Sequence, residues 1–253
     1  MKFNRRLIGK GCTVLVIMVS LLGGLSAQGA YRMEEFTSEE DFKHEVSLSA
    51  GPAIPLGNTR SFMPASSGFV DGIPQGALFG GGVNATYRYY PLHQLYLGAT
   101  LFGQWYGYDY RKLDLASADR VEHSGWSVYG AAIEIGTRLP LGIYGLYFTA
   151  HVQAGFALMC SPSLTTIYAN KDVGDIRRTL LESSLTGNLY LDGGFGVQYR
   201  FRRHWLCHIG LDYTFMPVGG WGLDSPVRYT DNSKDLTLKL SSFVISAGVS
   251  YAF

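Results

Sequence analysis

The stretch GNLYLDGGFGVQYRF, residues 187–201, alternates between two kinds of side chain along its whole length. One alternating set is mostly apolar: Leu189, Leu191, Gly193, Phe195, Val197, Tyr199 and Phe201. The other is mostly polar or small: Asn188, Tyr190, Asp192, Gly194, Gly196, Gln198 and Arg200. A period of two residues indicates a β-strand whose two faces meet different surroundings. Since strands are usually about five or six residues long, a strand of this length is unusual for a soluble protein.

The same alternation recurs along the rest of the chain. It predicts seven further strands, at about 44–54, 77–90, 95–106, 126–139, 146–158, 205–215 and 242–253. Three connections are short, namely YPLHQ, PLGIYG and RRH, and they alternate with long polar segments at about 55–76, 107–125, 160–186 and 217–237. An even number of long strands, with short turns on one rim and long loops on the other, predicts an all-β fold. We expect an eight-stranded antiparallel up-and-down β-barrel, closed between its first and last strands.

Alternation alone does not say which face of the barrel is apolar. A soluble barrel of the lipocalin kind buries its apolar face, whereas a membrane barrel turns that face outward to lipid. Two features favour the membrane form. Charged and small residues share the polar face, as in a narrow lumen, and aromatic residues gather near strand ends, as in interfacial girdles. The expected girdle residues are Tyr87, Tyr89, Tyr90, Trp105, Tyr106, Tyr108, Tyr144, Tyr147 and Trp205.

The composition agrees with two environments for one set of strands. Aromatic residues make up 14% of the chain, glycine occurs 32 times, and only 16% of residues are charged. The mean hydropathy is nevertheless only +0.06, so the chain is not hydrophobic overall. After the N-terminal segment no apolar run approaches the length of roughly 20 residues that a spanning helix needs, and we expect no transmembrane helix.

The N-terminus has the organisation of a secretory signal. A basic segment with Lys2, Arg5, Arg6 and Lys10 precedes an apolar run, and small residues follow at 25–27. We predict a cleaved signal peptide at 1–27 for Sec-type export, an acidic periplasmic segment at 28–43, and the barrel at 44–253. An uncleaved anchor is the alternative, although the apolar run is short for one. Cleavage removes four of 21 basic residues and leaves 17 against 20 acidic ones, a net charge of −3, which argues against a nucleic-acid partner.

The last eight residues, SAGVSYAF (246–253), carry a recognisable pattern. Ser246, Gly248, Tyr251 and Phe253 resemble the C-terminal signal of outer-membrane proteins, with the spacing polar-x-Gly-x-x-aromatic-x-aromatic. The resemblance implies that the barrel-assembly machinery binds this segment during insertion. From residue 44 onward the chain is similar to the small outer-membrane β-barrel families of Gram-negative bacteria, akin to the OmpA barrel in architecture. The resemblance implies a monomer in the outer membrane, in contact with lipid and lipopolysaccharide. It also implies no peptidoglycan-binding domain after Phe253.

The lumen is the expected location of a polar network. An eight-stranded barrel is just wide enough for its own side chains to fill it. The predicted lumen face carries Arg88, Glu134, Arg138, His151, Asp192, Arg200, His208 and Asp212, with the three arginines near the short-turn rim. Buried charges must pair or neutralise, because desolvation costs several kcal/mol per ion. A salt-bridged plug is therefore expected, and a gated or proton-linked path is the alternative.

Catalysis and metal binding are not expected. Glu134 and His151 lie on neighbouring strands and are placed to touch, and small barrels with lipid A deacylase activity are a precedent for an acid and histidine pair. That chemistry needs access to lipid, and a His-x-Ser spacing is missing after both His151 and His208. Asp192 and Asp212 offer only two carboxylates, so we expect no metal centre and no cofactor.

The two cysteines of the mature chain fall on opposite rims. Cys160 lies at the long-loop rim and Cys207 near the short-turn rim, so two free thiols are expected. The pattern as a whole indicates a structural or surface-interaction role for the long loops, with a surface or periplasmic protein as the partner. A narrow porin or channel is one alternative. An accessory subunit of an outer-membrane transport or secretion complex is another, and a lipid A-modifying enzyme ranks below both.

Overall fold

The computed structural model describes residues 42–56, 62–63, 73–74, 77–110, 118–143, 145–169, 174–183, 185–216 and 240–253. The predicted signal peptide at 1–27 and almost all of the predicted segment at 28–43 lie outside these residues. The strands of the remaining unit are β1 (His44–Pro55), β2 (Phe62–Met63), β3 (Ile73–Pro74), β4 (Ala77–Leu92), β5 (Leu95–Tyr108), β6 (Arg120–His123), β7 (Trp126–Pro140), β8 (Leu146–Cys160), β9 (Leu164–Tyr168), β10 (Ile176–Leu181), β11 (Leu185–Arg200), β12 (Trp205–Met216) and β13 (Leu240–Ala252). Within the described residues there is no helix with the length and apolar character to span a membrane.

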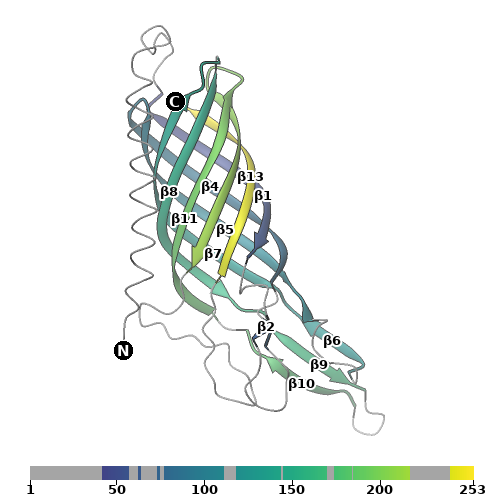
Figure 1. Ribbon diagram of the computed structural model, residues 1–253. Helices are drawn as coiled ribbons and strands as arrows, with labels where there is room; N and C mark the ends of the chain where they lie inside the picture. The colour runs from purple at the N-terminus through teal and green to yellow at the C-terminus, as the bar shows by residue number, and fades with distance from the viewer. Residues whose placement is uncertain are drawn as a thin grey trace, which may run out of the picture. The chain divides into compact units, whose positions relative to one another are not determined.

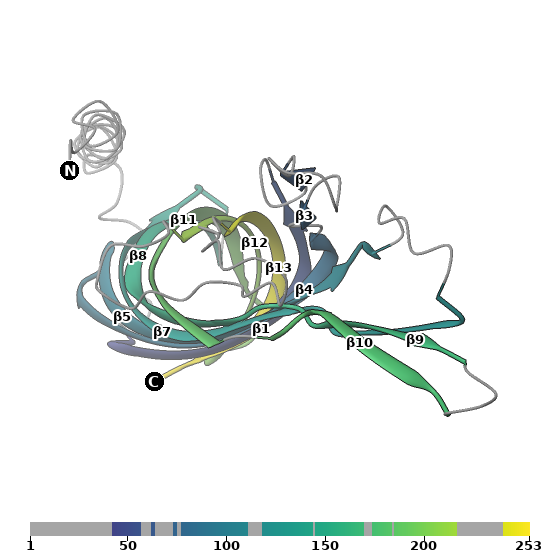
Figure 2. The same ribbon diagram turned by 90° about the horizontal axis from the view of Figure 1, so that it is seen from below.

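Eight of these strands form one closed barrel. Their order around the ring is β1-β13-β12-β11-β8-β7-β5-β4, and every pair is antiparallel. Figure 1 shows the long tilted strands from the side, and Figure 2 looks into the ring. Closure leaves no strand edge with unpaired amide and carbonyl groups, as a barrel in lipid requires. The predicted eight-stranded barrel is confirmed.

The strand boundaries follow the sequence period closely. Each predicted strand begins and ends within three residues of the observed one. Three short turns lie on one rim: residues 93–94 join β4 to β5, residues 141–145 join β7 to β8, and residues 201–204 join β11 to β12. The start of β1 and the end of β13 lie on the same rim. The long connections lie on the opposite rim, as predicted.

The outer surface resolves the choice between a soluble and a membrane barrel. Large apolar side chains point outward along every barrel strand, and Leu101, Ile133 and Ile209 are 65%, 69% and 66% exposed. Water penalises exposed apolar surface by about 25 cal/mol per Å², so a continuous belt of this kind needs lipid around it. The barrel strands contain 12 to 16 residues, more than the 9–11 or so that a tilted strand needs to cross a bilayer. The barrel is therefore a transmembrane one.

Aromatic residues form girdles on this surface, but not all of the predicted ones belong to them. Tyr87, Tyr89, Trp105 and Trp205 are exposed as predicted. Three of the predicted girdle residues, namely Tyr90, Tyr106 and Tyr108, are instead buried inside the barrel. They lie on the inner face of their strands. The position of a residue along a strand sets its depth in the membrane, whereas the two-residue alternation sets whether its side chain faces lipid or the lumen. Tyr147 also faces inward, against Arg138, and Tyr144 lies outside the described residues.

The lumen is apolar and aromatic toward the long-loop rim. Phe102 and Tyr190 stack with ring centroids 3.9 Å apart. Nearby, Tyr106 Oη donates a hydrogen bond to Gln104 Oε1 at 2.8 Å and lies 2.7 Å from the hydroxyl of Ser242. The surrounding cluster contains Ala53, Ala77, Tyr108, Trp126, Val128, Ala132, Ala157, Met159, Leu164, Met216, Leu240 and Val244. The polar filling expected for the whole lumen is therefore concentrated in the other half.

The C-terminal strand closes the barrel. Phe253 and His44 exchange two backbone hydrogen bonds, from His44 N to Phe253 O at 3.0 Å and from Phe253 N to His44 O at 2.8 Å. Their rings stack on the outer surface with centroids 5.5 Å apart. Ser246 and Ser250 point into the lumen, whereas Tyr251 and Phe253 point outward. The first strand therefore holds the last residue of the chain.

A second sheet continues three of the barrel strands beyond the long-loop rim. Its order, β10-β9-β6, repeats the order of β11, β8 and β7 in the barrel. Each of its strands is separated from its barrel strand by only two or three residues. Figures 1 and 2 show this sheet extending away from the ring. The sequence pattern predicts only loops here, because the pieces have four to six residues each, too few to show a period.

The two cysteines lie at opposite ends of the barrel. Cys160 ends β8 at the long-loop rim, and Cys207 lies near the start of β12 at the short-turn rim with its side chain exposed. Both are free thiols.

Removal of the last three residues should prevent insertion. A chain that ends at Ser250 loses both backbone hydrogen bonds to His44 and the outward-facing Tyr251 and Phe253. We expect most of this variant to stay out of the membrane, as measured by the heat-dependent gel shift of folded barrels in membrane fractions. Phe253→Trp keeps an aromatic anchor and is the matched control. Normal assembly of the truncated chain would contradict the role given to this strand.

Candidate functional site

The centre of the polar half of the lumen is one carboxylate, that of Glu45 on β1. Glu45 is fully buried, with 0% exposure. Arg88 Nη1 lies 3.1 Å from its Oε1, and Arg138 Nη1 lies 3.6 Å from its Oε2. Tyr90 Oη donates a hydrogen bond of 2.8 Å to Oε2, and Gln198 Nε2 donates one of 2.9 Å to Oε1. Four side chains from three other strands thus converge on one acid.

Arg88 connects this acid to a second one. Its Nε and Nη2 both lie 3.1 Å from Glu134 Oε1 on β7. Thr100 Oγ1 donates a hydrogen bond of 3.2 Å to Glu134 Oε2. Two buried acids are therefore matched by two buried arginines, which removes the large penalty of an unpaired buried charge. We call Glu45, Arg88, Glu134 and Arg138 the rim cluster.

Aromatic rings pack against the guanidinium groups of this cluster. Arg138 lies over the rings of Tyr90 and Tyr147, at 4.3 and 5.0 Å from their centroids. Arg88 lies 4.9 Å from the ring centroid of Tyr96, and Arg200 lies 5.7 Å from that of Tyr147. Such cation–π contacts add to the ion pairs where water is excluded. Together they fill the lumen near the short-turn rim.

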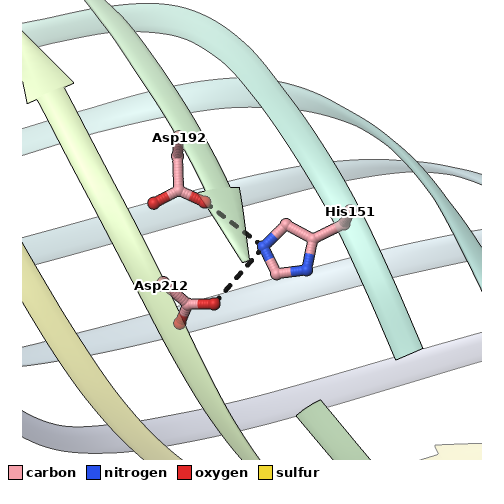
Figure 3. A group of neighbouring side chains, drawn as sticks. All are labelled: His151, Asp192 and Asp212. Atoms are coloured by element: carbon pink, nitrogen blue, oxygen red, sulfur yellow. Dashed lines mark hydrogen bonds and ion pairs between the residues drawn. The ribbon is translucent and has the colours of Figure 1, made fainter. Parts of the chain in front are cut away.

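A second cluster lies deeper in the lumen. His151 Nε2 on β8 lies 3.2 Å from Asp192 Oδ1 on β11 and 3.5 Å from Asp212 Oδ1 on β12. Figure 3 shows the imidazole pointing between the two carboxylates. Ser246 Oγ donates a hydrogen bond of 3.3 Å to Asp212 Oδ2. We call His151, Asp192 and Asp212 the His–Asp cluster.

A glycine makes this convergence possible. Gly194 on β11 is the register partner of His151 on β8 and of Asp212 on β12. A methyl group at Gly194 would overlap Asp212 Oδ1 and lie 2.8 Å from His151 Cε1. Because residue 194 has no side chain, the two neighbours lean across it toward each other. Gly194, the second glycine of DGGFG, thus creates the space for the cluster.

The structure places all eight predicted lumen residues in the barrel interior and sorts them into groups. Arg88, Glu134 and Arg138 belong to the rim cluster, and His151, Asp192 and Asp212 form the second one. The ion pairs of Glu134 and His151 run to these separate partners, and the predicted contact between the two stays a prediction. Arg200 packs on Tyr147, and His208 Nδ1 lies 3.4 Å from Ser250 Oγ.

The predicted lumen network does not include Glu45, which has four side-chain partners in the structure. Glu45 lies at the start of the predicted strand at 44–54, two residues after the predicted acidic segment. The signal that could have identified Glu45 is the two-residue alternation of its strand. Glu45 shares its strand face with Ser47 and Ser49, and all three are buried in the lumen. The sequence pattern also predicts acids only above the arginines, whereas Glu45 lies among them.

Two lumen serines lie near groups of the kind found in hydrolytic triads. The hydroxyl of Ser246 donates to the carboxylate of Asp212 rather than contacting an imidazole. His208 Nδ1 lies 3.4 Å from Ser250 Oγ, and Ser250 is only 1% exposed and lies inside the packed lumen.

A small cavity lies beside the His–Asp cluster. Its volume is about 40 Å³, and its lining includes His151, Gln153, His208, Asp212 and Ser246. A water molecule needs about 10–15 Å³ of such space, so the cavity has room for two or three waters. It is therefore a chamber with many polar side chains in its lining, next to the carboxylate of Asp212.

Neutralising Glu45 should destabilise the barrel strongly. Glu45→Gln keeps the shape of the side chain but leaves Arg88 and Arg138 with one acid between them. We expect a loss of about 3–5 kcal/mol of unfolding free energy, measured by urea unfolding in detergent micelles followed by tryptophan fluorescence. Glu122→Gln is the control, since Glu122 also pairs with two arginines but is exposed in the loop sheet, and its loss should cost at most about 1 kcal/mol. Equal unfolding midpoints for Glu45→Gln and the unmodified protein would contradict this account.

Similar proteins are found only among solved structures. No protein-family model matches the chain, and no curated protein matches it in sequence. Neisserial surface protein A is 12% identical, with a TM-score of 0.45 over 83% of this chain and 97% of that one. Ail, the attachment invasion locus protein of Yersinia pestis, is 15% identical, with a TM-score of 0.43 over 83% and 99%. A major outer membrane protein from Thermus thermophilus is 16% identical, with a TM-score of 0.44 over 83% and 99%.

Identities and TM-scores this low carry no information about what the chain binds or does. The class of the protein follows instead from its own geometry. The ring of eight antiparallel strands is closed, its outer surface is apolar, and its charges lie inside. By fold and by the polarity of its two faces, the chain is an eight-stranded β-barrel of the outer-membrane type.

Proposed function

We propose that the protein is a closed outer-membrane anchor that presents the β10-β9-β6 sheet at the cell surface for contact with a partner protein. The observation that carries this proposal is the sheet itself. Two different long connections, after β5 and after β8, supply its strands, and the three strands extend the barrel wall past the rim. A loop without a binding role has no need of an ordered sheet.

Contacts within this sheet indicate a defined surface rather than a loose loop. Asp119 N donates to Ile167 O at 3.0 Å, and Ala169 N donates to Asp119 Oδ2 at 2.7 Å. At the other end, Ser163 N donates to Ser124 Oγ at 2.7 Å. Leu164, Thr166 and Ile167 of the central strand are buried. An ordered surface loses less conformational entropy when it binds, which favours a specific partner.

The exposed side chains of the sheet are mixed in charge. Glu122 on β6 lies 3.5 Å from Arg120 and 3.6 Å from Arg177, which reaches it from β10. Ile176 is also exposed, but as the strand neighbour of Arg177 it lies on the other face of the sheet. The face with Glu122, Arg120 and Arg177 suits a polar protein interface.

The filled lumen supports the anchoring role over transport. The rim cluster with its aromatic rings occupies the short-turn half, and the stacked Phe102 and Tyr190 lie across the other half. An eight-stranded barrel has no spare width beyond such side chains. We therefore assign the protein no solute path and no catalytic role.

Three further partners belong to this proposal. The apolar belt runs around every strand, so lipid and, in the outer leaflet, lipopolysaccharide surround a monomer. The barrel-assembly machinery receives β13 during insertion. Export through a Sec-type route comes before this insertion into the outer membrane.

A barrel closed in this way should not conduct. In planar lipid bilayers we expect no steady openings above the background of the lipid alone. An open porin inserted into the same membrane serves as the positive control. Steady openings that scale with the amount of protein would favour the narrow-channel alternative and overturn the proposed plug.

Breaking the loop sheet should remove partner binding without harming the barrel. Thr166 lies in the central strand and pairs with both Val121 and Arg178. Thr166→Pro removes a backbone donor from the middle of a sheet, whereas Thr166→Ser keeps it. We expect Thr166→Pro to remain a heat-modifiable barrel, to be cut faster by protease in the loop sheet, and to lose partners crosslinked by the unmodified protein. Retention of the same crosslinked partner by Thr166→Pro would show that binding does not use the sheet.

A further inference from the structure

The His–Asp cluster has a composition that the rim cluster lacks. The rim cluster balances two acids with two arginines, but Asp192 and Asp212 face one histidine. Both aspartates are only 8% exposed. With both aspartates ionised, the cluster carries one excess negative charge when the imidazole is protonated and two when it is neutral. Such a charge is expensive to bury without a counter-ion.

Hydrogen bonding alone does not satisfy the cluster. His151 Nε2 faces oxygen atoms of two carboxylates, yet this nitrogen carries at most one proton. Asp192 Oδ2 is buried and has no hydrogen-bond partner among the described residues. A buried carboxylate oxygen without a partner is rare and needs an explanation, such as an ion that binds there.

The two distances from the histidine nitrogen to the carboxylates match those between neighbouring ligands of one ion. Metal–ligand bonds of about 2.0–2.2 Å at tetrahedral or octahedral angles place neighbouring ligand atoms roughly 3.0 to 3.5 Å apart. The observed separations from His151 Nε2 are 3.2 Å to Asp192 and 3.5 Å to Asp212. One ligand atom from each of the three residues lies within 4.8 Å of the others. Little movement is needed to place an ion between them.

Surrounding groups supply what the three side chains lack. The cavity of about 40 Å³ borders His151 and Asp212 and can hold the water molecules that complete the coordination. Ser246 donates a hydrogen bond to Asp212 Oδ2 and so orients that carboxylate, as partners of metal ligands commonly do.

We propose that His151, Asp192 and Asp212 bind one divalent transition-metal ion of the zinc or manganese class inside the lumen. One imidazole with two carboxylates suits these ions, whereas calcium and magnesium prefer oxygen ligands alone. A divalent ion also cancels the two carboxylate charges. Because the ligands come from β8, β11 and β12, which are adjacent in the ring, the ion joins three consecutive strands.

The site is testable by metal content and by spectroscopy on the full-length protein in detergent. After treatment with a chelator and dialysis against zinc or manganese, we expect one ion per chain by elemental analysis. Cobalt bound in place of zinc should give visible absorption typical of nitrogen and oxygen ligands. Absence of a stoichiometric ion in the unmodified protein would overturn the proposal whatever the variants do.

Variants locate the ion. Asp192→Asn and Asp212→Asn change one atom each, and His151→Gln is a third variant in case either fails to fold. Each should lower metal affinity by more than the roughly 10–100-fold that loss of an outer-shell partner costs, and Ser246→Ala should fall within that range. His123→Ala and Asp119→Asn, both in the loop region outside the barrel, are matched controls that should keep the ion.

Folding is checked separately for every variant by the heat-dependent gel shift, so that loss of metal is not confused with loss of the barrel. Unchanged affinity in the folded variants of the His–Asp cluster, or loss of the ion in the loop controls, would place the metal on the surface and contradict the proposal.

Discussion

The structure depends on one constraint, that no backbone amide or carbonyl group of the transmembrane strands can be left unpaired in lipid. This constraint is met where β1 meets β13, and the pairing runs to the last residue, since Phe253 and His44 exchange both of their backbone hydrogen bonds. Closure in turn fixes the width of the barrel, and the width fixes what its interior can hold. The final residues are part of the wall, with Tyr251 and Phe253 facing outward and Ser250 inward.

A narrow interior must neutralise every charge that it contains. The rim cluster does so with protein groups alone, because Arg88 connects Glu45 and Glu134 and Arg138 adds a second cation. The His–Asp cluster contains two acids and one histidine at similar depth of burial, which is why it points to a bound cation. Both clusters join strands across the lumen. The proposed function lies with the parts outside the membrane, where three strands continue past the rim as an ordered sheet.

Much of this could be predicted from the sequence, because a period of two residues is a local signal. Alternation predicts the eight strands and the face on which Asp192, Arg200 or Asp212 lies. It does not say which lumen residues meet, because that depends on the register between strands that are distant in sequence. His151 reaches Asp212 only because Gly194 lies between them. The two-residue period also places Glu45 and Tyr106 on the lumen face, as the structure does. The predicted lumen network nevertheless does not include Glu45, and the predicted aromatic girdle wrongly includes Tyr106. The short strands of the loop sheet were too brief to show a period.

The central claim is that the apolar face of the strands lies in lipid and the charged face in the lumen. It is tested most directly by a spin-label scan of residues 189–198 on β11, with the protein in lipid bilayers and the oxygen accessibility of each label measured. The account predicts a period of two, with high accessibility at Leu189, Leu191, Phe195 and Val197 and low accessibility at Tyr190, Asp192 and Gln198. The reverse phase, or equal accessibility at all positions, would contradict it.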